Sequence, residues 1–347
     1  MKKEIKIGLI GHYAKGQSLY DGQTVSTRLW QRQLERKGAK VCLVDTYNYK
    51  KNPVKIIASW VRCMFTCENI IIMLSANGLY VFLPLLYYSN KLFKRKIFHR
   101  VIGGSLDKYV EKHPKSIKYL QSMEINWVQS QELVKKLEVW EIRNAEYLEN
   151  FRDVKPIDKV LPYQIHNNYK FCTFCRVSAA KGITLAIESI SKVNEKAGDI
   201  IAELHIYGPV ENEYKDEFER LCEKHSKYVK YMGSVASENA VEVLKDYFMH
   251  LFPTTWSGEG FPGTIIDCYN AGLPTIASNW AYNSEFIKND MTGYVYDWKK
   301  PEQLAQLIEF AINNSDRNYG MRLNNLHEAK KYSADIIMSR VLGEIFV

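Results

Sequence analysis

One stretch of the sequence, residues 253–278, constrains the fold more than any other. It reads PTTWSGEGFPGTIIDCYNAGLPTIAS and follows an apolar segment that ends at Phe252. The pattern predicts a buried strand, a loop rich in Gly and Pro, a helix that begins near Pro262 or Gly263, and a second strand at residues 274–277. Proline is tolerated in the first turn of a helix, and Ala271-Gly272 is a common stop signal. A strand, a glycine loop and a helix start in this order form a geometry that binds anions.

The beginning of the predicted helix is therefore a candidate anion site. We expect the backbone N–H groups of Gly263, Thr264 and Ile265 to point outward, with the positive end of the helix dipole behind them. Glu259 in the loop and Asp267 in the helix flank this site, and carboxylates accept hydrogen bonds from hydroxyl groups. A phosphate site between two acids favours a nucleotide sugar. An acid that caps a helix beside a Gly-rich turn is the alternative.

A second pair of cations follows an apolar segment earlier in the chain. The segment Tyr169-Lys-Phe-Cys-Thr-Phe-Cys delivers Arg176, and Lys181 lies five residues later, just before a helix with a 3.6-residue apolar period. Two cations at a turn from strand to helix make a second anion site. Ordinary surface residues are the alternative for an Arg and a Lys at this spacing.

Together these elements resemble retaining glycosyltransferases of the two-Rossmann-domain (GT-B) fold, family four. The first motif of that family is Glu, seven residues, Glu, and this chain has Glu259 and Asp267 at these positions. The second is Gly-Arg followed by Glu-Lys-Gly, and this chain has Cys175 in place of the Gly before the Arg and Ala180 in place of the Glu before the Lys. The resemblance covers most of the chain and is specific mainly in residues 171–278. It implies an α/β fold of two Rossmann-like doubly wound domains that face each other across a cleft.

The resemblance also implies roles for individual residues. Arg176 and Lys181 would hold the donor diphosphate, Glu259 would contact donor-sugar hydroxyls, and Asp267 would contact the ribose diol. The expected catalytic residues are Glu259, Arg176 and Lys181, and the expected donor-binding residues are Asp267, Gly260, Phe261, Pro262, Gly263, Thr264, Gly208, Met232, Gly22 and Gln23. No Asp-x-Asp motif is present, so we expect neither a metal nor a cofactor in this site. No general base is assigned.

Length and charge predict two domains. A chain of 347 residues is long enough for two cores. Residues 1–165 hold 28 Lys and Arg against 15 Asp and Glu, and the remainder holds 19 against 24. With the resemblance, this implies an N-terminal acceptor-side domain at 1–160, with a last helix at 334–347 that packs back on it, and a C-terminal nucleotide-sugar domain at 161–333. The linker is placed at about 152–168.

The first domain begins with strands at residues 5–10 and 41–44, separated by a loop and a helix. Its loop contains Asp21, Gly22 and Gln23, which are candidate neighbours of donor or acceptor; a solvated loop is the alternative. The chain lacks a GxGxxG fingerprint, which argues against NAD. His99 lies within a predicted strand and is not expected to be catalytic.

Targeting signals and cysteine usage point to the cytoplasm. The start, Met1-Lys-Lys-Glu-Ile-Lys, is no signal peptide, and Ser75, Asn77, Gly78 and Pro84 interrupt the apolar run at 70–88, so a transmembrane helix is not expected. Seven cysteines without a framework spacing suggest a reducing compartment. The pair Cys172 and Cys175 reads as buried thiols rather than a zinc or redox site.

A segment of mixed basic and aromatic residues predicts contact with an anionic lipid surface. It consists of Tyr87, Tyr88, Lys91, Phe93, Lys94, Arg95, Lys96, Phe98 and Arg100. Each basic side chain near such a surface contributes about 1 kcal/mol. A solvated helix end is the alternative.

The sequence thus predicts a retaining glycosyltransferase that moves a sugar from a nucleoside-diphosphate sugar, with UDP favoured, to a hydroxyl of a saccharide acceptor. The basic first domain suggests that this acceptor is lipid-linked, as in cell-surface polysaccharide synthesis at the inner face of the membrane. A nucleotide-sugar epimerase of the same fold is an alternative. A basic nucleic-acid-binding protein is another, although no nucleic-acid motif supports it.

Overall fold

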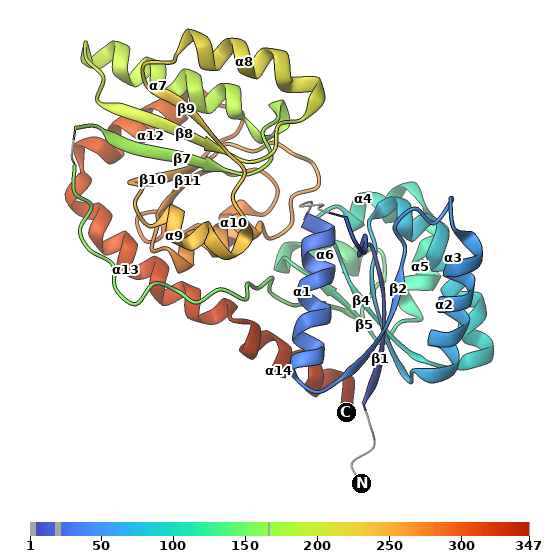
Figure 1. Cartoon of the computed structure of the whole chain (residues 1–347). Helices are drawn as coiled ribbons and strands as arrows, with labels where there is room; N and C mark the ends of the chain where they lie inside the picture. The colour runs from blue at the N-terminus through green and yellow to red at the C-terminus, as the bar shows by residue number, and fades with distance from the viewer. Residues whose placement is uncertain (1–4, 18–21, 166, 347) are drawn as a thin grey trace. The chain divides into compact units, whose positions relative to one another are not determined.

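The structure, a computed structural model, describes residues 5–17, 22–165 and 167–346, and it divides into two compact units. Unit 1 comprises Met1–Asn150 and Ala334–Val347, and unit 2 comprises Phe151–Ser333 (Figure 1). The sequence prediction placed this division ten residues later, between 160 and 161. Each unit is described on its own.

Unit 1 is built on a six-stranded parallel sheet with the order β2-β1-β3-β4-β5-β6. Its strands are β1 (Lys6–Gly11), β2 (Lys40–Asp45), β3 (Asn69–Met73), β4 (Lys96–Arg100), β5 (Ile125–Val128) and β6 (Ala145–Tyr147). Its α-helices are α1 (Gly22–Arg36), α2 (Pro53–Thr66), α3 (Ala76–Phe93), α4 (Leu106–Lys112), α5 (Ile117–Gln121), α6 (Gln131–Val139) and α14 (Ala334–Phe346). All five residues of β3 are buried, as in a parallel sheet whose two faces are both covered.

Helix α3 accounts for the apolar run that follows β3. It begins at Ala76, so Asn77 and Gly78, which interrupt the apolar run in the sequence, lie in its first turn, and Ser75 lies just before it. Pro84 lies inside the helix, and four of its apolar side chains are buried against unit 1. Within the described residues, no helix is long and apolar enough to cross a membrane.

The last helix, α14, belongs to unit 1 although it is the last element of the chain. The indole N–H of Trp127 in β5 donates a hydrogen bond of 2.6 Å to Glu344. Lys37, just after α1, forms an ion pair of 2.8 Å with Asp335. Ile337, Met338 and other apolar residues of α14 are buried, so this helix is part of the unit 1 core.

Unit 2 holds a second six-stranded parallel sheet with the order β12-β11-β10-β7-β8-β9. Its strands are β7 (Tyr169–Phe174), β8 (Ala202–Tyr207), β9 (Val229–Gly233), β10 (Met249–Phe252), β11 (Thr275–Ser278) and β12 (Gly293–Tyr296). Its α-helices are α7 (Ile183–Ala197), α8 (Lys215–Lys224), α9 (Ala240–Leu244), α10 (Gly263–Asn270), α11 (Asn283–Phe286), α12 (Glu302–Asn313) and α13 (Asn318–Ala329). Helices α7 and α12 pack on the same core, which includes Phe171, Ile187 and Ile308.

The segment expected as a linker is packed on unit 2. The Ile157 N–H donates to the carbonyl of Asn270 at the end of α10, and Val160 is only 2% exposed. Arg152 forms an isolated bridge with Ser333, so the two points at which the chain passes between the units lie side by side. The segment that enters unit 2 and the segment that leaves it are therefore paired by a backbone bridge.

Candidate functional site

Most of the predicted donor residues lie near the carboxyl ends of the strands of the unit 2 sheet. The chain runs from β7 outward through β8 and β9 and then returns to β10 on the other side of β7, so the strand order reverses between β7 and β10. In open parallel sheets, ligands bind at the carboxyl ends of the strands beside such a reversal. Arg176 and Lys181 follow β7, and Glu259 and the start of α10 follow β10. Both halves of the sequence motif therefore flank the reversal point.

A glycine allows the two loops to meet. Gly182 has a φ of +72°, and a Cβ at this position would collide with the backbone carbonyl of Pro253. The loops are further tied by the Thr255 N–H, which donates a hydrogen bond of 2.8 Å to the carbonyl of Ala180. Close backbone contact at Gly182 thus fixes Lys181 beside the loop that carries Glu259.

Lys181 and Glu259 form a buried ion pair. The Lys181 ammonium donates a hydrogen bond to Glu259, and the two side chains are 13% and 4% exposed. The ammonium also lies 4.5 Å from the centre of the Trp256 ring, a cation–π contact. Burial raises the pKa of Glu259, and the charge of Lys181 opposes that shift. An ammonium has three N–H donors, so Lys181 retains capacity for a phosphate oxygen.

The start of α10 differs in part from the sequence prediction. The N–H of Ile265 donates to the Pro262 carbonyl at 3.1 Å, so it is not available to an anion, contrary to expectation. The guanidinium of Arg152 instead lies against the first turn of α10. It is so close that a Cβ on Gly263 would collide with its Nη2. The first turn of α10 therefore combines the positive end of the helix with an arginine.

The same arginine engages Asp267. Arg152 donates through Nε to Oδ1 at 2.9 Å and through Nη2 to Oδ2 at 3.2 Å, and the Asp267 side chain is 4% exposed. Burial raises the pKa of Asp267, and the nearby Arg152 lowers it. A carboxylate offers about four lone-pair sites, so two remain for hydroxyl groups. Sequence reasoning missed Arg152 because it lies 115 residues from its partner, in a segment read as a linker.

Arg176 lies in a more open environment than Lys181. Its Nη1 is 3.1 Å from a carboxylate oxygen of Glu211, and the two side chains are 47% and 37% exposed. Gly208 has a φ of +130°, and a Cβ there would collide with the carbonyl of Cys175, the residue before Arg176. The predicted residues Arg176 and Gly208 are thereby brought together at the ends of β7 and β8.

Two predicted donor residues have side chains in unexpected places. Phe261 is 2% exposed, and its ring stacks on Phe286 with 3.9 Å between ring centres. Its side chain therefore anchors the loop inside unit 2 rather than facing a ligand. Gly260 before it is also buried, whereas Pro262 is half-buried. Met232 lies on the edge strand β9 with 46% of its surface exposed.

The predicted residues of unit 1 lie at its own reversal point, between β1 and β3. Gly22 is exposed at the start of α1, and Gln23 donates a hydrogen bond of 3.2 Å to the carbonyl of Met73 at the end of β3. Asp21 lies outside the described residues. His12, which the sequence analysis did not single out, follows β1 and lies 2.8 Å from the Thr24 hydroxyl.

His99 and part of the basic segment are buried in β4. His99 has no exposed surface, bonds to Asn126, and has a pKa lowered to about 4 by burial. Arg100 is also fully buried and donates to the carbonyls of Leu148 and Glu149. Phe98 is 2% exposed. The expectation that Phe98 and Arg100 face a lipid surface is therefore wrong, because β4 is a central strand of the sheet.

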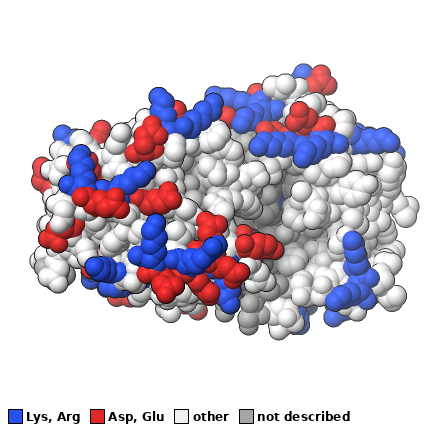
Figure 2. Space-filling model, turned by 90° about the horizontal axis from the view of Figure 1, so that it is seen from above, with Lys and Arg blue, Asp and Glu red and all other residues white. Residues whose placement is uncertain are grey.

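Helix α2 adds an exposed apolar stripe that the sequence analysis did not recognise. Val54, Ile57, Val61 and Phe65 recur at helical spacing and are 78%, 60%, 44% and 66% exposed. The Phe65 ring contacts Phe93 of α3 with 4.9 Å between ring centres, so the ends of the two helices meet. Residues 50–100 hold nine Lys and Arg and one acid. Acidic side chains are more frequent over unit 2 (Figure 2).

Comparison with known proteins agrees with this geometry. Residues 168–314 match the family described as Glycosyl transferases group 1. No curated protein matches the chain. Among solved structures, sucrose-phosphate synthase from Thermosynechococcus elongatus is similar with a TM-score of 0.80 and 13% identity, over 99% of each chain. HepE from Anabaena in complex with UDP-glucose is similar with a TM-score of 0.75 and 13% identity, over 98% of this chain and 99% of that chain. The lipopolysaccharide outer core galactosyltransferase WaaB is similar with a TM-score of 0.71 and 12% identity, over 99% of each chain. The predicted GT-B fold is thereby confirmed.

Proposed function

We propose that the chain is a glycosyltransferase that transfers a sugar from a UDP-sugar to a hydroxyl of a saccharide acceptor with retention at the anomeric carbon, and the match of residues 168–314 to the group 1 family supports this. The observation that carries the proposal is the buried Lys181–Glu259 pair beside the start of α10, at the reversal point of the sheet. The structures of HepE with UDP and with UDP-glucose support the choice of base. The spacing of Glu259 and Asp267 supports retention.

In the proposed reaction, the departing diphosphate gains negative charge as the bond to the sugar breaks. Lys181, Arg176 and the first turn of α10 with Arg152 stabilise that charge, in a site that is organised before the donor binds. Glu259 accepts hydrogen bonds from the sugar hydroxyls, and the charge of Lys181 opposes the rise in its pKa that burial causes. The remaining lone pairs of Asp267 accept from the ribose diol.

The donor site needs no divalent metal in this proposal, because cationic side chains take its place at the diphosphate. In the described part of unit 2, no three metal-ligating side chains lie close enough to share an ion. The experiment is to incubate the purified protein with UDP-sugars, with and without an acceptor glycan, in buffer with Mg²⁺ or with EDTA. Acceptor-dependent transfer that persists in EDTA is expected. Conversion of the donor sugar without acceptor would favour an epimerase, and a strict requirement for Mg²⁺ would contradict the metal-free site.

We further propose that the acceptor is lipid-linked and that α2 and α3 dock unit 1 on an anionic membrane surface. The apolar stripe Val54, Ile57, Val61 and Phe65 supplies a face that enters the interface, and Leu92 of α3 is 79% exposed. Lys91, Lys94 and Lys96 lie beside it and are exposed. An apolar helix face bordered by Lys and Arg is typical of peripheral membrane attachment.

Vesicle sedimentation separates the two contributions. Replacing Lys91, Lys94 and Lys96 by Glu removes attraction to anionic vesicles, and at about 1 kcal/mol per charge the affinity falls by on the order of 100-fold. Phe65→Glu weakens binding at any salt concentration, because it places a charge in the apolar stripe. A control variant, Lys215→Glu on the exposed face of α8 in unit 2, binds as the wild type does. Equal binding to neutral and anionic vesicles would contradict the docking proposal.

A further inference from the structure

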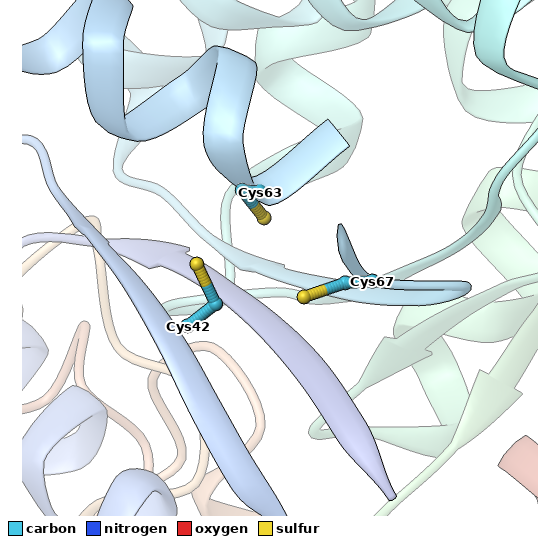
Figure 3. A group of neighbouring side chains, drawn as sticks. All are labelled: Cys42, Cys63 and Cys67. Carbon is cyan, nitrogen blue, oxygen red and sulfur yellow. The ribbon is translucent and has the colours of Figure 1, made fainter. Parts of the chain in front are cut away.

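Three cysteine side chains converge in unit 1. Cys42 comes from the edge strand β2, Cys63 from the last turn of α2, and Cys67 from the residue that follows α2. Their sulfur atoms all lie within 4.8 Å of one another, and the three side chains point toward a common centre (Figure 3). Among the described residues, this is the one group of three or more Cys, His, Asp or Glu side chains close enough to share a metal ion.

A glycine makes the space for this cluster. Gly8 of β1 is paired with Cys42 of β2 on one side and with Ile70 of β3 on the other. A Cβ at Gly8 would collide with the Sγ of Cys63. Because Gly8 has no side chain, the Cys63 sulfur fits between α2 and the sheet and lies close to the Cys42 sulfur.

The three sulfurs differ in exposure. Cys63 and Cys67 are buried, whereas Cys42 is half-buried, and the neighbouring residues Arg62 and Thr66 are exposed. Cysteine binds metals as the thiolate, so binding of an ion at this cluster would release protons.

The geometry fits a metal ion with small adjustments. Zinc–sulfur bonds of about 2.3 Å place the sulfurs of a tetrahedral site about 3.8 Å apart. Sulfurs within 4.8 Å of one another reach that spacing by movements of under about 1 Å, which rotation of the side chains supplies. Soft thiolate ligands select Zn²⁺ and Cu⁺ over harder cations.

We propose that Cys42, Cys63 and Cys67 form a three-thiolate site for one thiophilic cation, for which Zn²⁺ is the test ion. The fourth position of the ion faces the half-exposed side of Cys42 and takes a water molecule. Because Cys42 lies on the edge strand and the other two lie at the end of α2, the bound ion ties this helix to the sheet. Metal binding would then stabilise unit 1 without taking part in sugar transfer.

The test uses the whole purified protein, reduced with a phosphine and stripped with a chelator. Cd²⁺ is added as a spectroscopic probe, and the ultraviolet charge-transfer absorption of cadmium–thiolate bonds is followed. We expect the absorption to saturate at one ion per chain, and Zn²⁺ to compete for the same site. Zn²⁺ at about a hundred times its dissociation constant should raise the melting temperature by roughly 5 °C or more, and it should protect Cys42 from alkylation.

Two variants and a matched control complete the test. Cys42→Ser keeps the size of the half-buried side chain and should weaken Cd²⁺ binding by on the order of 100-fold. Gly8→Ala should weaken it as well, by displacing Cys63. Cys222→Ser, at a half-buried thiol of α8 in unit 2, should leave binding unchanged. Absent absorption at stoichiometric Cd²⁺, or equal affinity in Cys42→Ser, would overturn the proposal. A disulfide between two of these cysteines in protein that binds no metal would also overturn it, in favour of a redox pair.

Discussion

The two reversal points of this molecule share an architecture and differ in how their charged side chains are bonded. In unit 2, two ion pairs have largely buried carboxylates: Lys181–Glu259, which joins the loops after β7 and β10, and Arg152–Asp267 at α10. In unit 1, charged side chains beside the loop after β1 bond to the backbone instead: Arg28 donates to the carbonyls of Tyr13 and Ala14, and Asp45 accepts from the N–H groups of the same two residues. Gln23 donates to the Met73 carbonyl, and His12 lies beside the Thr24 hydroxyl. The family match at residues 168–314 lies within unit 2, which supports our proposal that the donor binds there. The shared topology by itself would not have made that distinction.

The sheets themselves are also not identical. Counted from its own first strand, unit 2 has the order 3-2-1-4-5-6 of dinucleotide-binding folds, whereas unit 1 has the order 2-1-3-4-5-6, a flavodoxin-like order with one added strand. Both orders produce one reversal beside the first strand. With the reversal shared, the two units differ at that point in the residues that their loops carry.

The largest effect is expected at Lys181. Lys181→Ala removes a cation from the departing diphosphate and should lower kcat/KM by on the order of 10³. It should also lower the free energy of unfolding by about 3 kcal/mol, because Glu259 is left charged and buried. Steady-state kinetics and urea unfolding measure the two effects. Lys196→Ala, at an exposed pair with Glu309, is the matched control and should change neither. Near-normal turnover of Lys181→Ala would break the assignment.

The next effect concerns Arg152 and Asp267. Arg152→Ala leaves the buried carboxylate unpaired and should cost about 3 kcal/mol of unfolding free energy. Adding Asp267→Asn in the same chain should restore much of that loss, since the uncompensated charge is then gone. Glu211→Gln, which breaks the exposed pair with Arg176, should cost less than about 1 kcal/mol. Equal costs at the two pairs would show that burial does not distinguish them.

A smaller effect is shared by the two units. Each sheet holds a fully buried histidine, His99 in unit 1 and His250 in unit 2, whose pKa is lowered by burial to about 4 and about 3. The unfolded chain binds these protons near pH 6.5 and the folded chain does not, so stability is present above pH 6.5 and is lost as the pH falls toward these values. Each histidine should cost about 2 kcal/mol between pH 7 and pH 5.

Urea unfolding of His99→Gln and His250→Gln at both pH values measures that contribution. Each variant should lose about 2 kcal/mol less than the wild type on acidification, because the titrating group is gone. In unit 2, the raised pKa values of Glu259 and Asp267 act in the opposite direction, since the folded chain then takes up protons more readily than the unfolded chain. Identical pH slopes in wild type and both variants would contradict the burial of these rings as the cause.

The sequence predicted local structure well and long-range contacts poorly. The strand, loop and helix at 249–270 lie where apolar periodicity and Gly and Pro signals placed them, and the helix at 334–346 lies where the resemblance to the family implied. Arg152 was missed because no local pattern joins it to Asp267. Phe98 and Arg100 were misread because alternating basic and aromatic residues also fit a central strand, and only the neighbouring strands show that both faces are covered.

The same limit applies to the two clusters on unit 1. The apolar stripe of α2 and the contact of Cys42 with Cys63 and Cys67 depend on which helix face the sheet covers. The period of α2 shows that it has two faces, and both carry apolar residues, so the sequence does not reveal which one is buried. In the structure, Trp60 and Met64 are buried in the core, so the face that carries Val54, Ile57, Val61 and Phe65 is the exposed one.

The most direct test of the central claim is hydrogen–deuterium exchange of the whole protein with and without UDP. The account predicts slower exchange in peptides that cover residues 176–183 and 253–265, with the N–H groups of Gly263 and Thr264 among the protected ones, and little change in peptides that cover β1 and the start of α1. It also predicts that Lys181→Ala loses this protection at the same UDP concentration. Protection confined to unit 1, or equal protection in wild type and Lys181→Ala, would contradict a donor site at the reversal point of unit 2.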